Sequence, residues 1–242
     1  MDLGVPVIPE VTPEVTSEVE AGAHRGELVV LLHGLGRTRF SMRPVERALR
    51  ARGFRTANIG YRSGSGTIEA LAARVWAAVE QLAEPFDQVH FVTHSLGGIL
   101  VRQLLKQGVV KRVGRVVMLA PPNHGSEIVD DLGKWRLLPA VMGPAFEQLG
   151  TGPAGPERLG PASVPVAVIA GRRTQAPFSG VFSGPNDGKV STESARLEGM
   201  SAFLIVNENH MLIMRSPEVH EAIVRYLETG ELVATEARRE SG

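Results

Sequence analysis

Short apolar runs alternate along this chain with segments of helical spacing, and this alternation limits the folds open to it. Aliphatic and β-branched residues fill the runs at 27–32, 54–61, 88–93, 115–120, 164–170 and 202–207. Apolar residues with a helical period occur at 43–53, 68–82, 96–105 and 216–230. Strands that alternate with helices favour a mostly parallel sheet, and continuously apolar strands indicate burial on both faces. We therefore predict an α/β fold whose sheet is covered by helices on both faces.

All six predicted strands fit one domain, at residues 27–230. The chain has 242 residues, of which 43% are hydrophobic, and this suffices for one sizeable core. Residues 1–26 hold acids and prolines where a signal peptide needs a basic patch and an apolar stretch. We interpret them as a flexible leader or as an extended segment on the domain, and find no clear strand pair there. Residues 231–242 are expected to form a solvated tail.

Residues 121–163 interrupt the alternation between the fourth and fifth predicted strands. A long insertion in a compact domain is more often functional than incidental, so we predict a cap or lid. A lid over an acyl pocket and a fixed cap packed on the domain both agree with amphipathic spacing. The apolar residues of this segment are Trp135, Leu137, Leu138, Val141 and Met142.

Charge and cysteine content exclude several classes of function. The 26 basic and 26 acidic residues balance, so no charge excess points to nucleic acid or to an anionic membrane. The chain has no cysteine, which excludes disulfides, thiolate catalysis and thiolate metal sites. This composition fits a reducing compartment, and we expect a cytoplasmic location. No run approaches the ~20 apolar residues that span a bilayer.

The turn after the third predicted strand places a hydroxyl where a helix begins. Ser95 stands between the strand and the glycine pair Gly97 and Gly98, in the stretch FVTHSLGGIL. A serine on a tight strand-to-helix turn is pushed clear of the sheet, beside the free N–H groups of the helix N-terminus. We predict Ser95 as a nucleophile. The alternative is a serine N-cap, with glycines that serve helix packing.

A serine nucleophile needs a general base and an acid that orients the base. His210 comes just after the sixth predicted strand, and Asp187 lies in a glycine-flanked loop after the fifth. Ligands bind beyond the carboxyl ends of parallel strands, so the fold can unite these residues with the serine. We predict His210 as the base and Asp187 as the acid. Glu193 is the second choice for the acid, ahead of Asp130, Asp131 and Glu208.

The loop after the first predicted strand supplies a further part. Gly34 and Gly36 follow the buried strand in LLHGLGRT, so this loop can aim the Leu35 N–H at the nucleophile. With the Leu96 N–H it would form an oxyanion hole, which typically lowers a barrier by several kcal/mol. Three more histidines are expected to support these loops rather than to act as the base: His33, His94 and His124.

The sequence resembles the α/β-hydrolase superfamily, and within it the bacterial lipase- and esterase-like proteins. The matching stretches follow the family's order: VVLLHGLGRT, VHFVTHSLGGILVR, VVMLAPPNHGSE, GPNDGKVS and NENHMLIM. The resemblance implies an α/β-hydrolase fold, with Ser95 as nucleophile, Asp187 as acid, His210 as base, and Leu35 and Leu96 as oxyanion donors. It implies no redox cofactor. We find no convincing carboxylate cluster and therefore predict no metal.

We predict a serine hydrolase that cleaves carboxylic esters through an acyl-enzyme on Ser95, without a cofactor. Its substrate is a small-molecule ester or a lipid, held in an apolar pocket with the alcohol side near the insertion. A thioesterase, an amidase, an acyltransferase or a non-catalytic binding protein stays an alternative, because the motifs do not encode the leaving group or acceptor. We expect no nucleic-acid partner, and nothing in the sequence indicates membrane contact.

Overall fold

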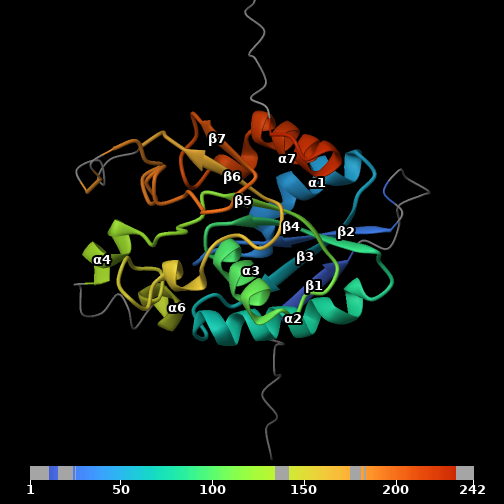
Figure 1. Ribbon diagram of the computed structural model, residues 1–242, viewed down its shortest axis with the longest axis horizontal. Helices are drawn as coiled ribbons and strands as arrows, with labels where there is room; N and C mark the ends of the chain where they lie inside the picture. The colour runs from blue at the N-terminus through green and yellow to red at the C-terminus, as the bar shows by residue number, and fades with distance from the viewer. Residues whose placement is uncertain are drawn as a thin grey trace, which may run out of the picture.

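A mixed sheet of seven strands forms the centre of the protein (Figure 1). The computed structural model describes residues 11–15, 24, 26–133, 142–174, 181, 182 and 184–232. In spatial order the strands are β1-β3-β2-β4-β5-β6-β7, and all are parallel except β1, which pairs antiparallel with β3. Their bounds are β1 Val11–Val15, β2 Glu27–Leu32, β3 Arg55–Tyr61, β4 Gln88–His94, β5 Val113–Leu119, β6 Val166–Gly171 and β7 Ala202–Val206.

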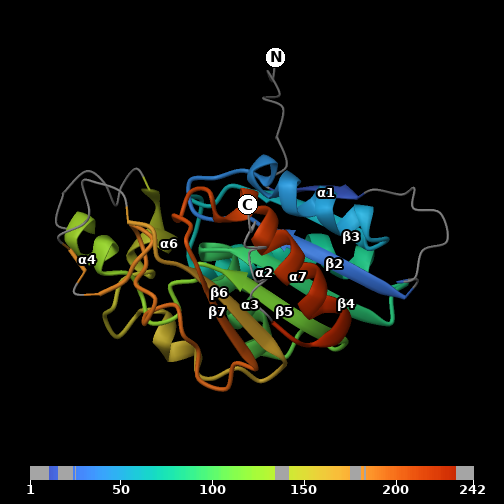
Figure 2. The same ribbon diagram turned by 90° about the horizontal axis from the view of Figure 1, so that it is seen from above.

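Helices cover both faces of the sheet (Figure 2). On one face lie α2 (Ile68–Ala83) and α3 (Leu96–Gln107), and on the other α1 (Arg43–Ala51) and α7 (Pro217–Thr229). Alternate residues of each strand point to opposite faces. On β2, Leu28, Val30 and Leu32 therefore join the core under α2 and α3, whereas Val29 and Leu31 join the core under α1 and α7. Because both faces of the sheet are buried, each central strand is a continuous run of apolar residues.

The structure confirms the predicted fold and all six predicted strands, whose ends differ from the prediction by at most two residues. Strand β1 was not predicted. Val11 lies opposite Tyr61, and the pairing continues to Val15 opposite Ala57. An edge strand needs a partner on one side only, so it tolerates a proline that a central strand would exclude. Pro13 sits in this position, opposite Ile59.

The insertion lies beside the carboxyl ends of the parallel strands (Figure 2). It contains α4 (Glu127–Gly133), α6 (Pro144–Glu147) and a short 3-10 helix at Pro156–Leu159. Four residues named for the lid, Trp135, Leu137, Leu138 and Val141, fall outside the described residues. None of the helices in the described part of the chain is long and apolar enough to cross a bilayer.

Candidate active site

Ser95 occupies the turn between β4 and α3 with an unusual backbone conformation. Its φ is 51° and its ψ is −119°, which costs a non-glycine residue on the order of 1–3 kcal/mol. Two hydrogen bonds hold the turn: the Ser95 N–H donates to the Leu119 carbonyl at 2.9 Å, and the Gly98 N–H donates to the Ser95 carbonyl at 2.9 Å. The sheet and the helix therefore fix the position of the serine from both sides.

Two glycines make room for this turn. A Cβ on Gly97 would lie 2.6 Å from the Leu32 carbonyl oxygen and 2.9 Å from the Leu32 Cβ. A Cβ on Gly34 would lie 2.8 Å from His94 Nδ1 and 3.1 Å from the Ser95 Cβ. At each glycine the shortest of these distances is below 3.0 Å, which is too short for a real Cβ. The first-strand loop and α3 can therefore approach the serine only because these residues lack a Cβ.

The predicted acid and base are in direct contact. Nδ1 of His210 lies 2.8 Å from Oδ2 of Asp187, and both side chains are buried. The His210 N–H donates to the Asp187 carbonyl at 3.0 Å. The second carboxylate oxygen accepts from the N–H groups of Lys189 at 2.9 Å and Val190 at 2.8 Å. With both oxygens occupied, the carboxylate holds the imidazole in one orientation.

His94 joins the serine turn to the His210 loop. Its Nε2 lies 2.9 Å from the His210 carbonyl oxygen, and the two rings are tilted with centroids 4.8 Å apart. Since a carbonyl only accepts, Nε2 carries the proton. Burial, followed by the nearby His210, holds the pKa of His94 well below its ordinary value. His94 is therefore a neutral brace that positions the loop of His210.

The first-strand loop is held by the residues that end β3. The Tyr61 hydroxyl donates to the His33 carbonyl at 2.5 Å, and the Gly36 N–H donates to Ser63 Oγ at 2.9 Å. Gly36 has a φ of +65°. Neither the Leu35 N–H nor the Leu96 N–H finds an acceptor among the described residues, so both amides are available as donors.

His33 is buried as a neutral ring beneath this loop. The Tyr61 N–H donates to its Nε2 at 3.4 Å, so Nδ1 carries the proton and donates to the Gly34 carbonyl at 2.9 Å. The ring also stacks on Tyr61 with a centroid separation of 4.1 Å. Burial lowers the pKa of His33 to about 4, against two hydrogen bonds that raise it.

A cavity of about 430 Å³ opens onto Ser95 and His210. Leu35 lines it beside them, and much of the remaining wall comes from the insertion. The apolar residues of that wall are Ile128, Val129, Leu132, Met142, Phe146 and Leu149. The serine and the histidine thus face one apolar space, at the carboxyl edge of the sheet where ligands bind in parallel α/β folds.

Other candidate residues lie apart from this cavity. His124 is exposed, and its Nδ1 lies 3.5 Å from a carboxylate oxygen of Glu157. Its N–H donates to the Ser194 carbonyl at 3.0 Å, which ties the loop after β5 to the loop after β6. Among the rival acids, Glu193 pairs with Arg196 at 3.3 Å and Asp130 accepts from Thr151. Glu208 and Asp131 are likewise not among the residues that line the cavity.

Sequence reasoning missed Tyr61, Ser63, Arg37 and Lys189. Tyr61 and Ser63 stand at the carboxyl end of a predicted strand, which was the available signal for them. Arg37 and Lys189 line the cavity and stand two residues after the predicted donor Leu35 and the predicted acid Asp187. Proximity in sequence was their only signal, because the direction of a side chain in a loop depends on tertiary packing.

The fold and the site together are those of an α/β-hydrolase, and comparison with known proteins gives the same family. The sequence matches the alpha/beta hydrolase family over residues 29–237. The chain belongs to the alpha/beta hydrolase family. No curated protein sequence matches the chain.

Solved structures of lipases and esterases share this fold. The mature lipase BlEst2 of Bacillus licheniformis is 21% identical with a TM-score of 0.75, covering 89% of this chain and 98% of that one. The metagenomic carboxyl esterase MGS0156 is 22% identical with a TM-score of 0.73, covering 87% and 78%. A thermophilic esterase of Thermogutta terrifontis is 17% identical with a TM-score of 0.58, covering 90% and 93%.

We expect Gly97→Ala to destabilise the protein and to displace Ser95. Backbone and Cβ atoms of Leu32 block the added methyl group, so the start of α3 must shift, at about 1–3 kcal/mol of unfolding free energy. Urea unfolding measures this loss. Gly152→Ala is the matched control because nothing lies within 4 Å of its added Cβ. Equal stability of the two variants would contradict the close approach at Gly97.

We expect His33 to make the protein less stable as the pH falls. Its pKa is about 4 in the folded chain and about 6.5 when unfolded, so the unfolded chain binds the extra proton between these values. The contribution of the neutral His33 ring to the free energy of unfolding is fully present above pH 6.5 and is lost as the pH falls toward 4. At pH 5 the loss is about 2 kcal/mol. Urea unfolding of wild type and His33→Asn at pH 7 and pH 5 checks this. The same pH dependence in both proteins would contradict it.

Proposed function

We propose that this protein is a serine hydrolase of carboxylic esters. The observation that carries the proposal is that Ser95, on its strained turn, lines the same cavity as the His210 that contacts Asp187. A nucleophile, a base and an orienting acid are the three parts that this chemistry needs. The known lipases and esterases that share the fold favour esters over other acyl compounds.

The proposed reaction has two halves. Ser95 Oγ attacks the acyl carbonyl while His210 takes its proton, and Asp187 stabilises the resulting imidazolium. The Leu35 and Leu96 N–H groups donate to the oxyanion. His210 then gives the proton to the leaving alcohol, which leaves an acyl group on Ser95. Water, deprotonated by His210, attacks the acyl-enzyme, and the carboxylic acid departs as Ser95 regains its proton.

The apolar wall of the cavity suits the acyl chain. Ile128, Leu132, Phe146 and Leu149 line it with hydrocarbon, and the hydroxyl of Ser126 is used by the Lys189 carbonyl. Apolar contact stabilises a hydrocarbon by roughly 0.8 kcal/mol for each buried CH₂. This arrangement assigns the insertion to the acyl portion, whereas the sequence-based expectation put the alcohol there. A volume of about 430 Å³ suits acyl chains of short or medium length.

Replacing Ser95 by Ala should abolish ester hydrolysis. Loss of the nucleophile is expected to reduce kcat by at least about 10³-fold. Steady-state hydrolysis of p-nitrophenyl esters of graded acyl length measures this reduction. Ser163→Ala is the control, since Ser163 is exposed and is not among the residues lining the cavity. Activity that survives in Ser95→Ala at the wild-type level would eliminate this serine as the nucleophile.

Asp187→Asn should lower kcat much more than it changes KM. An amide keeps the shape of the carboxylate but no longer stabilises the imidazolium or enforces the productive tautomer, at a cost on the order of 10³–10⁴ in kcat. The rival acid supplies the comparison, and Glu193→Gln should stay within about twofold of wild type, as surface substitutions do. The reverse order of effects would reassign the acid.

A further inference from the structure

The charged side chains that face the cavity are of one sign. Arg37 and Lys189 line it, and no Asp or Glu is present among its described lining residues. The only carboxylate of the proposed triad, Asp187, is occupied by His210 and two backbone N–H groups. An apolar cavity therefore has two cations at its reactive end, in a chain with no net charge.

Arg37 is fixed beside His210. Its side-chain Nη2 donates to the carbonyl of Met211 at 3.0 Å. Its backbone N–H donates to the Gly34 carbonyl at 3.2 Å. Its Nε is buried and has no hydrogen-bond partner among the described residues. Burial and the positive charge of Arg215 lower the pKa of Arg37. The guanidinium thus has one buried N–H without a partner, and the charged side chain that shifts its pKa is another cation.

Lys189 approaches the same place from the loop of Asp187. Its N–H donates to Asp187 at 2.9 Å, and its carbonyl accepts from Ser126 Oγ at 2.7 Å, so its backbone is anchored on both sides. The residue as a whole is exposed, yet desolvation of its ammonium by the surrounding protein, followed by the positive charge of Arg37, lowers its pKa, while the charge of Asp187 raises it. Neither cation forms an ion pair with a carboxylate in the described part of the chain.

An anion on the substrate would relieve this repulsion, and the site indicates which part of the substrate carries it. His210 must give its proton to the leaving oxygen, so the alcohol portion lies beside its ring. Arg37 contacts the residue after His210, and Lys189 lies two residues after its partner Asp187. Both cations therefore lie at the part of the cavity where His210 would give its proton to the alcohol portion.

We propose that the preferred substrates are esters whose alcohol portion carries an anionic group, a carboxylate or a phosphate, bound by Arg37 and Lys189. This inference rests on the proposed ester hydrolysis. Arg37 offers the planar, directed N–H donors of its guanidinium, and Lys189 offers a mobile point charge. Charge-assisted hydrogen bonds of this kind are stronger than neutral ones. Phosphate and carboxylate share this chemistry.

A matched pair of chromogenic esters tests the proposal. One is p-nitrophenyl butyrate, and the other carries an added carboxylate on the nitrophenyl ring. The readout is the ratio of kcat/KM for the anionic ester to kcat/KM for the neutral ester, each divided by its spontaneous hydrolysis rate. This ratio cancels any loss of activity that affects both esters. We expect a wild-type ratio well above one that falls with added salt, because salt screens exposed charges.

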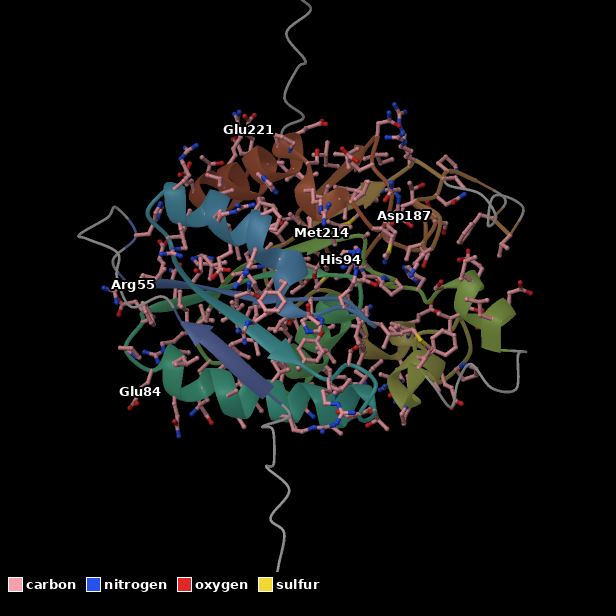
Figure 3. All side chains as sticks on the ribbon, turned by 180° about the vertical axis from the view of Figure 1, so that it is seen from behind. Arg55, Glu84, His94, Asp187, Met214 and Glu221 are labelled. Atoms are coloured by element: carbon pink, nitrogen blue, oxygen red, sulfur yellow. The ribbon has the colours of Figure 1, made fainter. Side chains whose placement is uncertain are left out.

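Charge removal should lower the ratio. We expect about a fivefold decrease for Lys189→Gln and for Arg37→Gln, and a larger decrease for the double variant, since one partly exposed charge contact contributes about 1 kcal/mol. Lys111→Gln and Arg55→Gln are the matched controls and should keep the wild-type ratio. Lys111 is exposed and lines a different pocket. Arg55 begins β3 and lies at the opposite end of the molecule from Asp187 (Figure 3).

Each outcome has a separate meaning. A wild-type ratio at or below one, or a ratio that the Arg37 and Lys189 variants leave unchanged, would overturn the anionic substrate while leaving ester hydrolysis intact. Failure of wild type to hydrolyse either ester would overturn the proposed function and this inference together. A phosphate-bearing aryl butyrate, measured in parallel, distinguishes the two anions by which of them gives the higher ratio.

Discussion

The contact between His210 Nδ1 and Asp187 Oδ2, at 2.8 Å, depends on nearly every feature of this fold. The two residues leave the sheet after β7 and β6, so they meet only if those strands are parallel neighbours in register. The buried carboxylate is tolerable because backbone N–H groups satisfy its other oxygen, since an unpaired buried charge would cost several kcal/mol. The contact is thus a product of the sheet and of a loop that supplies its own donors.

Two neutral histidines hold the loops of the site in place. His94 bridges the serine turn to the His210 carbonyl, and His33 supports the glycine loop from below. Burial keeps the pKa of each ring below its ordinary value. A protonated His94 would add a buried charge beside the imidazolium expected on His210. Of these three histidines, His210 alone has a carboxylate partner for the charge that it takes up during the reaction.

Burial on both faces made the sheet predictable, because it forces continuous apolar runs such as 27–32 and 88–93. The site followed from the same logic: Ser95, Asp187 and His210 each come after a predicted strand, and the ends of parallel strands converge. Strand β1 escaped prediction because an edge strand needs neither an apolar run nor a proline-free stretch. Arg37 and Lys189 escaped because their importance lies in a shared cavity with no acid among its described lining residues, which is a property of tertiary structure.

The central claim is that the hydroxyl of Ser95 is activated by its place in this assembly. Mass spectrometry of the protein after reaction with a fluorophosphonate tests it most directly, since such reagents modify activated serines. The account predicts a single phosphonyl adduct on the peptide that contains Ser95, and no adduct in His210→Ala, which lacks the base. Modification of a different serine, or an unmodified protein under conditions that label a known serine hydrolase, would contradict the account.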